Sequence, residues 1–141
     1  MATGENTGET AEITLKTKLI QLGRARGKSD NVLKGGKEHV IRRHIETLKE
    51  SLTEVSKWHR TVEAEKITSK EEVSEIDQWS NEIEKHIEAA DQTIGLLEQW
   101  LNDTQVKRED QHRQERMNFE LKLEEAKIKL KAEHKKVEAP S

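Results

Sequence analysis

Cysteine and tyrosine are absent from this 141-residue sequence, and proline occurs once. Without cysteine the chain forms no disulfide, has no thiolate for catalysis and cannot bind zinc through sulfur. Hydrophobic residues make up 31% of the chain and aromatic residues only 3%. Ordinary globular domains have about 45–50% apolar residues. This supply cannot build a thick core, but it suffices for helices that bury narrow stripes.

Long apolar runs are also lacking. The sequence contains no 18-residue apolar stretch, and its first thirty residues hold no segment typical of a signal peptide. We therefore expect a cytoplasmic protein that makes no contact with a membrane. Charged residues are abundant, at 38% of the chain.

Apolar residues recur in alternating steps of three and four along two stretches, a spacing typical of helices packed along a narrow seam. The first seam comprises Ile41, Ile45, Leu48, Leu52, Val55, His59 and Val62. The second seam comprises Val73, Ile76, Ser80, Ile83, Ile87, Ala90, Ile94, Leu97 and Leu101. His59 is the polar residue that interrupts the first seam, and Ser80 is the one that interrupts the second. His59 could sense pH or fix the register of the helices, although a tolerated polar break is the simpler interpretation.

The connection between the seams is short. Ser69 and Glu72 have the spacing of a capping box, which predicts a turn at 66–69 and a new helix from residue 70. Two long helices with a short connection favour an antiparallel hairpin or coiled coil, here over residues 37–104.

The parts outside the hairpin are more polar. We expect residues 1–9 to be disordered. Residues 10–36 should form a short basic helix over about 11–25, followed by a glycine-rich linker or a broken helix over 23–36. We expect residues 105–137 to form a long charged helix that projects from the hairpin, with a tail at 138–141. An apolar stripe returns on this helix at Phe119, Leu123, Ala126 and Leu130, with Met117, Leu121 and Ile128 near it. The fold class expected is therefore all-α.

Three tryptophans each come directly before a seam position, at intervals of 21 residues: Trp58, Trp79 and Trp100. Rings at these positions widen the buried stripe. Packing within the hairpin is the favoured interpretation, and an aromatic dock for a partner is the alternative.

No residue constellation indicates catalysis, a metal or a cofactor. The segment from Gly23 to Ser29 is one residue too short for a phosphate-binding loop. The chain has six histidines: His39, His44, His59, His86, His112 and His134. No two of them are four residues apart, so no helix presents the usual metal-binding spacing. We expect a protein that is not an enzyme and acts on no small-molecule substrate.

Basic residues gather around the predicted linker and could hold phosphate groups without reading sequence. They are Arg24, Arg26, Lys28, Lys34, Lys37, Arg42 and Arg43. No aromatic residue lies among them for base stacking. Weak, nonspecific RNA contact is therefore an alternative function.

The order of these parts resembles a known family over about residues 12–136. The segments that carry the resemblance are Leu15–Ile20, Val40–Ile45, Ile83–Ala90, Leu97–Leu101 and Arg116–Glu124. Together they resemble the N-terminal coiled-coil region of Gag-like polyproteins of Pao/BEL-type LTR retrotransposons. The resemblance implies a structural, self-associating module without catalytic residues, and a chain that is a fragment or a stand-alone copy of a longer polyprotein.

The function expected is therefore non-catalytic self-association or scaffolding through the two seams, in a homo-oligomer or with another helical protein. Mixed Ile and Leu at the seam positions leave the oligomer number open. An adapter that presents helix 105–137 to another protein is a further alternative.

Overall fold

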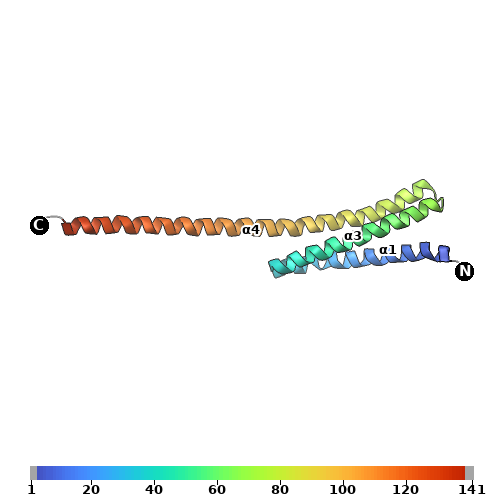
Figure 1. The fold of residues 1–141 in the computed structure, drawn as a ribbon, viewed down its shortest axis with the longest axis horizontal. Helices are drawn as coiled ribbons and strands as arrows, with labels where there is room; N and C mark the ends of the chain where they lie inside the picture. The colour runs from blue at the N-terminus through green and yellow to red at the C-terminus, as the bar shows by residue number, and fades with distance from the viewer. Residues whose placement is uncertain (1–2, 139–141) are drawn as a thin grey trace. The chain divides into compact units, whose positions relative to one another are not determined.

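The computed structural model describes residues 3–138, with side chains for 9–135. Four helices occupy this range: α1 Thr3–Gly27, α2 Ser29–Gly35, α3 Glu38–Thr68 and α4 Val73–Glu138 (Figure 1). No strand occurs in residues 3–138, so the predicted all-α class is confirmed.

The chain divides into two compact units, Met1–Leu101 and Asn102–Ser141. Unit 1 contains α1, α2, α3 and the first part of α4. Unit 2 is the remainder of α4. The boundary follows Leu101, the last residue of the second seam, and so lies three residues before the predicted end of the hairpin.

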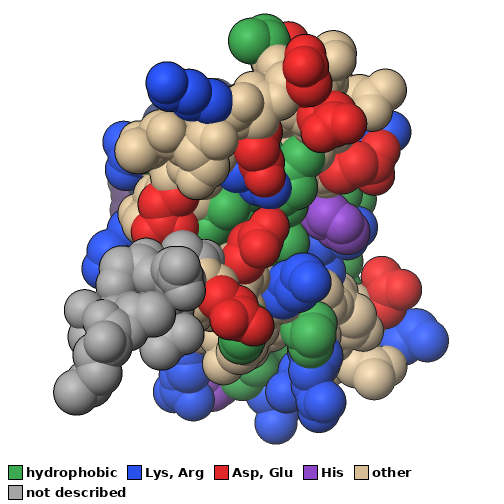
Figure 2. Space-filling model, turned by 90° about the vertical axis from the view of Figure 1, so that its right-hand side faces the viewer, with side chains coloured by type: hydrophobic (Ala, Val, Ile, Leu, Met, Phe, Trp, Pro, Cys, Tyr) green, Lys and Arg blue, Asp and Glu red, His purple; other side chains and the backbone are tan. Residues whose placement is uncertain are grey.

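The core of unit 1 is a single cluster of side chains from three helices. Its buried members are spaced by threes and fours along α3 and α4, as the heptad pattern predicts. They are Ala11, Leu15 and Leu22 from α1, Ile41, Ile45, Leu48, Val55 and Val62 from α3, and Ile83, Ala90, Ile94 and Leu97 from α4. On the face viewed in Figure 2, hydrophobic side chains show between charged ones, in keeping with their short supply.

Polar contacts between α3 and α4 follow a consistent order along the two helices. Lys49 pairs with Glu98, and the Lys49 Nζ lies 3.6 Å from the Glu98 carboxylate. Further along α3, His59 contacts Ser80 at 2.9 Å. Of these two contacts, the one with the higher residue number on α3 has the lower residue number on α4.

Val73 is a correction to the second seam. Its side chain is 71% exposed, and the buried part of the seam begins at Ile76. A helical side chain leans over the preceding turn of its own helix. Val73 is the first residue of α4, and only the exposed segment 69–72 precedes it.

Helix α1 is longer than predicted. A short helix from about residue 11 was expected after a disordered start, but the helix begins at Thr3. Residues 1–2 lie outside the described range. Once buried Leu15 and Leu22 hold the helix against α3, each further turn adds hydrogen bonds without a new nucleation cost.

Of the two expectations for residues 23–36, a linker or a broken helix, the structure shows the broken helix. Helix α1 continues through Gly23, and α2 follows after Lys28. Buried Leu22 and Ser29 anchor this segment, and that tertiary contact outweighs a helix penalty of about 1 kcal/mol per glycine. Only Gly36 needs its conformational freedom, because its φ of 62° places it in the left-handed region, where it caps α2.

The turn between α3 and α4 lies at 69–72 rather than at 66–69. Ser69 does not start α4 as a capping box would require, because it is the C-terminal cap of α3, and its N–H donates to Glu65 at 2.9 Å. Lys70 follows with a left-handed φ of 59°, which ends the helix. The Glu71 N–H then donates to the Lys66 carbonyl at 3.1 Å.

Candidate functional site

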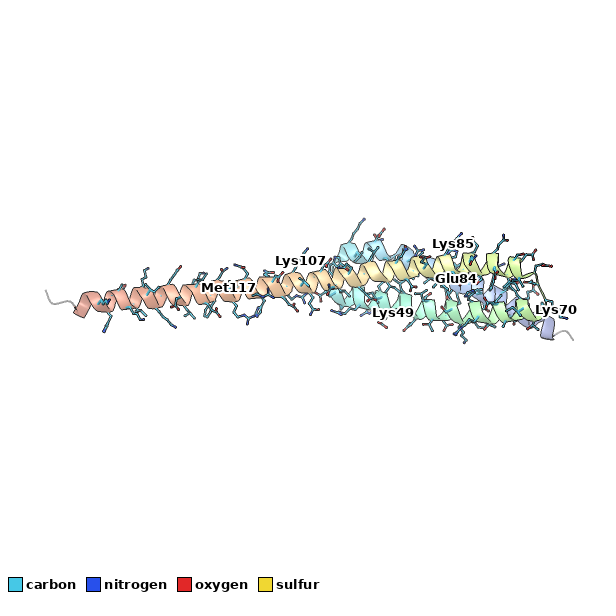
Figure 3. All side chains as sticks on the ribbon, turned by 90° about the horizontal axis from the view of Figure 1, so that it is seen from above. Lys49, Lys70, Glu84, Lys85, Lys107 and Met117 are labelled. Carbon is cyan, nitrogen blue, oxygen red and sulfur yellow. The ribbon has the colours of Figure 1, made fainter. Side chains whose placement is uncertain are left out.

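Unit 2 carries the main set of uncovered apolar side chains. Every described side chain from 105 to 135 is exposed. Phe119 is 63% exposed and Leu130 is 65% exposed. In Figure 3, the side chains around Met117 stand out from a single helix. These residues form the largest group of exposed apolar side chains in the part of the chain that the structure describes.

The apolar side chains of unit 2 lie on two faces of the helix. Phe119, Leu123, Ala126 and Leu130 follow steps of four, three and four and form one stripe, which we call the docking stripe. Leu121 was expected near this stripe. Successive helical residues turn by about 100°, however, so Leu121 lies about 160° from Leu123. Two further residues lie on the face that carries Leu121: Met117 and Ile128. This is a correction: the three residues form a separate stripe on the opposite face.

Two rows of charged residues run along either side of the helix face that carries the docking stripe, and both rows begin before Phe119. One row contains Arg108, Glu115, Lys122 and Lys129, and the other contains Arg113, Glu120, Lys127 and His134. Within unit 2, Arg113 pairs with Asp110 at 3.3 Å, with both side chains more than half exposed. Exposed pairs of this kind contribute little to stability, so the flanking charges can serve recognition at small cost.

The seam residues proposed for self-association lie in unit 1 and pack against the same chain. Most are buried, while Leu52, Ile87 and Leu101 are partly buried against the same cluster. Apart from exposed Val73, these side chains are therefore covered before any partner binds. Trp58, Trp79 and Trp100 also pack against this core and are half-buried.

One polar cluster ties together parts of unit 1 that are distant in sequence. The Lys66 ammonium lies 3.2 Å from Glu12 of α1 and 3.3 Å from Glu71 of the turn. It also lies 5.1 Å from the ring centroid of Trp79. Burial by itself would lower the pKa of Lys66, but hydrogen bonds and the charges of Glu12 and Glu71 outweigh it, and the pKa is raised. No motif in the sequence singles out Lys66, because its partners come from three separate segments.

A second polar contact lies where α2 meets α3. Ser29, buried at the start of α2, has its hydroxyl oxygen 2.9 Å from His44 Nε2. Burial lowers the pKa of His44, a hydrogen bond to the backbone of Ala25 opposes this shift, and the charge of Lys28 adds to it. The neutral form of His44 is thus favoured more strongly in the folded chain than in the unfolded chain.

The basic residues considered for nucleic-acid contact lie where α1, α2 and the start of α3 meet. Arg26 is half-buried, and its Nε donates to the Thr93 hydroxyl at 3.4 Å. Arg42 lies 3.9 Å from Glu38, one turn earlier in α3. The other five are exposed: Arg24, Lys28, Lys34, Lys37 and Arg43. RNA binding through them stays a prediction.

Among side chains 9–135, no group of three or more histidine, aspartate and glutamate residues is arranged to hold a metal ion. Across the helical range described, no helix combines the length and apolar character needed to cross a bilayer.

Comparisons with known proteins give no family assignment. The chain matches no protein-family model, no curated protein and no solved structure. The resemblance to Gag-like polyproteins therefore stays a prediction from the helical pattern.

Proposed function

We propose that this chain is a non-catalytic helical adapter. In this proposal α3 and the first part of α4 form an antiparallel hairpin, α1 packs on it, and unit 2 presents the docking stripe to a helix of a partner. One contrast carries the proposal: the seam side chains other than Val73 are buried or partly buried within one chain, whereas those of the docking stripe are exposed.

The expected self-association through the seams fits this contrast less well. Leu48 and Leu97 are fully buried in unit 1, and the polar seam residues His59 and Ser80 contact each other. A second copy could use these side chains only if the helices separated first. The adapter, considered as an alternative from the sequence, needs no such rearrangement.

The docking stripe has enough apolar surface for reversible binding. Full burial of Phe119, Leu123 and Leu130 would contribute roughly 5–9 kcal/mol. Association costs at least several kcal/mol in lost freedom. A single partner helix would therefore bind and dissociate readily, as suits an adapter.

Thermal unfolding at several protein concentrations tests this proposal. A unit closed within one chain melts at a temperature that does not depend on concentration, whereas an obligate assembly melts higher as concentration rises. Mass from sedimentation should correspond to one chain. We expect Leu123→Asp to leave the melting temperature of unit 1 unchanged and to abolish binding of a helical peptide with an Ile/Leu core. A melting temperature that rises with concentration would refute the adapter.

A further inference from the structure

The two ends of the docking stripe carry opposite charges. The helix face that holds the stripe continues at Arg116, three residues before Phe119, and at Glu133, three residues after Leu130. Both charged side chains are exposed. From 116 to 133 this face reads Arg, Phe, Leu, Ala, Leu, Glu in chain order. A helix that covers the stripe must therefore offer a negative charge at one end and a positive charge at the other.

A second copy that runs parallel does not meet this requirement. In a parallel coiled coil in register, identical core positions face each other. Arg116 would face Arg116 and Glu133 would face Glu133, and both pairs repel. Two Phe119 rings would crowd one layer, and two Ala126 methyl groups would leave another layer underfilled. Charge and volume both act against parallel pairing.

A second copy that runs antiparallel matches the whole face. In one antiparallel register every layer joins two different residues, and two-fold symmetry forms each layer twice. The layers are Phe119 with Leu130, Leu123 with Ala126, and Arg116 with Glu133. The apolar layers thus combine a larger with a smaller side chain, and an ion pair lies at each end of the apolar stretch.

Neighbouring antiparallel registers lose this match. Sliding the copies by one heptad in one direction sets Leu123 opposite Glu133. Sliding them by one heptad in the other direction sets Leu130 opposite His112. Either shift places a polar side chain against a leucine and leaves fewer apolar layers, so the face specifies a single antiparallel register.

The two charged rows beside the stripe add little net attraction in this register. They bring together Glu120 with Lys127, Lys122 with Lys129, and Arg113 with His134 of the other copy. The first pair attracts, the second repels and the third adds no attraction. The charges at the two ends of the stripe therefore decide the orientation.

We propose that the docking stripe binds the same stripe of a second copy in antiparallel orientation, with Arg116 of each copy paired with Glu133 of the other. This inference rests on the adapter function proposed above and names the occupant of its docking stripe. The chain itself supplies both the apolar and the charged half of the match. The pair is weak, because two of its four apolar layers contain alanine and the lysines repel. Single chains therefore prevail at the low micromolar concentrations that suit the sedimentation and melting measurements above.

Sedimentation equilibrium of the full chain over a wide concentration range tests this inference. Between about 5 and about 500 µM at low salt, we expect the average mass to rise from one chain towards two. Added salt should reduce the rise. Leu123→Asp should keep the mass of one chain throughout. Leu121→Asp is the matched control, because it places the same charge on the opposite face of the helix and should behave as wild type.

Charge exchange tests the register. Arg116→Glu sets two acidic side chains against each other, Glu133→Arg sets two basic ones against each other, and each should weaken pairing at least about tenfold. Both substitutions in one chain restore opposite charges in the antiparallel pair and should restore pairing. In a parallel pair the doubly substituted chain would still repel itself. Glu124→Arg makes the same charge change about 180° around the helix from Glu133 and should leave pairing unchanged. Circular dichroism verifies that each variant keeps its helicity.

The outcomes separate this inference from the adapter. A mass of one chain up to about 500 µM would refute the inference. The adapter would still stand if the Ile/Leu peptide bound in a manner that depends on Leu123. Pairing that ignores both single charge changes would refute the antiparallel register. Pairing lost in Leu121→Asp and kept in Leu123→Asp would assign the contact to the opposite stripe and also refute the inference. If neither the peptide nor a second copy bound, both proposals would fail.

Discussion

His59 Nε2 lies 2.9 Å from the Ser80 hydroxyl oxygen, and each residue is the one polar member of its seam. The His59 ring also lies 5.3 Å from that of Trp79 at a tilt of 51°. Sliding α3 along α4 by one heptad would separate His59 from Ser80 and place His59 against apolar side chains of the second seam. This pair therefore specifies which turns of the two helices meet.

Removing one polar side chain of this pair should lower the free energy of unfolding more than replacing both. We expect Ser80→Ala to lower the free energy of unfolding by about 1–2 kcal/mol, because the half-buried His59 nitrogen loses its partner. His59→Leu combined with Ser80→Ala should be closer to wild type than the sum of the single variants. Urea denaturation followed by circular dichroism measures both, with exposed Ser74→Ala as the control. Strict additivity would show that the contact contributes nothing.

Lys66 should stabilise unit 1 through its contacts with three segments. Lys66→Met removes two ion pairs, and we expect it to lower the free energy of unfolding by roughly 1 kcal/mol. The effect is small because solvent can hydrate the carboxylates of Glu12 and Glu71 once the ammonium group is gone. Lys57→Met is the matched control. Lys57 lies 5.5 Å over the Trp58 ring but is exposed, so its loss should change stability by less than about 0.5 kcal/mol. Equal effects of the two variants would contradict the role assigned to Lys66.

Two adjacent leucines test whether the second seam is the core of unit 1. Leu97 is fully buried and Leu96 is 68% exposed. We expect Leu97→Ala to cost about 2–5 kcal/mol, through lost burial and the cavity left behind. Leu96→Ala should stay within about 0.5 kcal/mol of wild type. Thermal melts of the two variants compare them directly, and similar melting temperatures would mean that the seam is not packed as described.

Acidification should weaken unit 1 through His44. Because the pKa of His44 is lowered in the folded chain, the unfolded chain takes up a proton first as the pH falls through about 6.5. The stability contributed by neutral His44 is therefore present above that pH and is lost progressively below it. His44→Gln cannot titrate, so the stability difference between wild type and this variant should fall between about pH 8 and pH 5. A difference that stays constant over this range would count against the protonation of His44 as its cause.

The heptad spacing was sufficient to predict most of the core, because a period of three and four leaves only one face of a helix for burial. It could not predict the exposure of Val73, which depends on where α4 begins. Nor could it predict the start of α4, since Ser69 and Glu72 match a capping box in sequence, whereas Ser69 ends the preceding helix. Backbone hydrogen bonds at Ser69 and Glu71 decide that boundary, and a local motif does not reveal them.

The glycine-rich segment shows a second limit. Glycine propensity favours a linker at 23–36, but the burial of Leu22 and Ser29 keeps it helical. Such tertiary contacts commonly outweigh propensity. The docking stripe itself was visible in the sequence, because Phe119, Leu123 and Leu130 recur at helical spacing. The opposite position of Leu121 follows once a regular helix is known to run through that segment.

The turn at 69–72 between α3 and α4 is a suitable place to attach a label for these experiments. All four residues are exposed, and the segment joins α3 to α4 without contributing to the hydrophobic cluster. Lengthening a surface loop is inexpensive, at about 0.6 kcal/mol for each doubling of its length. An epitope or a fluorophore grafted beside Lys70 would thus report on the chain while leaving both the seams and the docking stripe untouched.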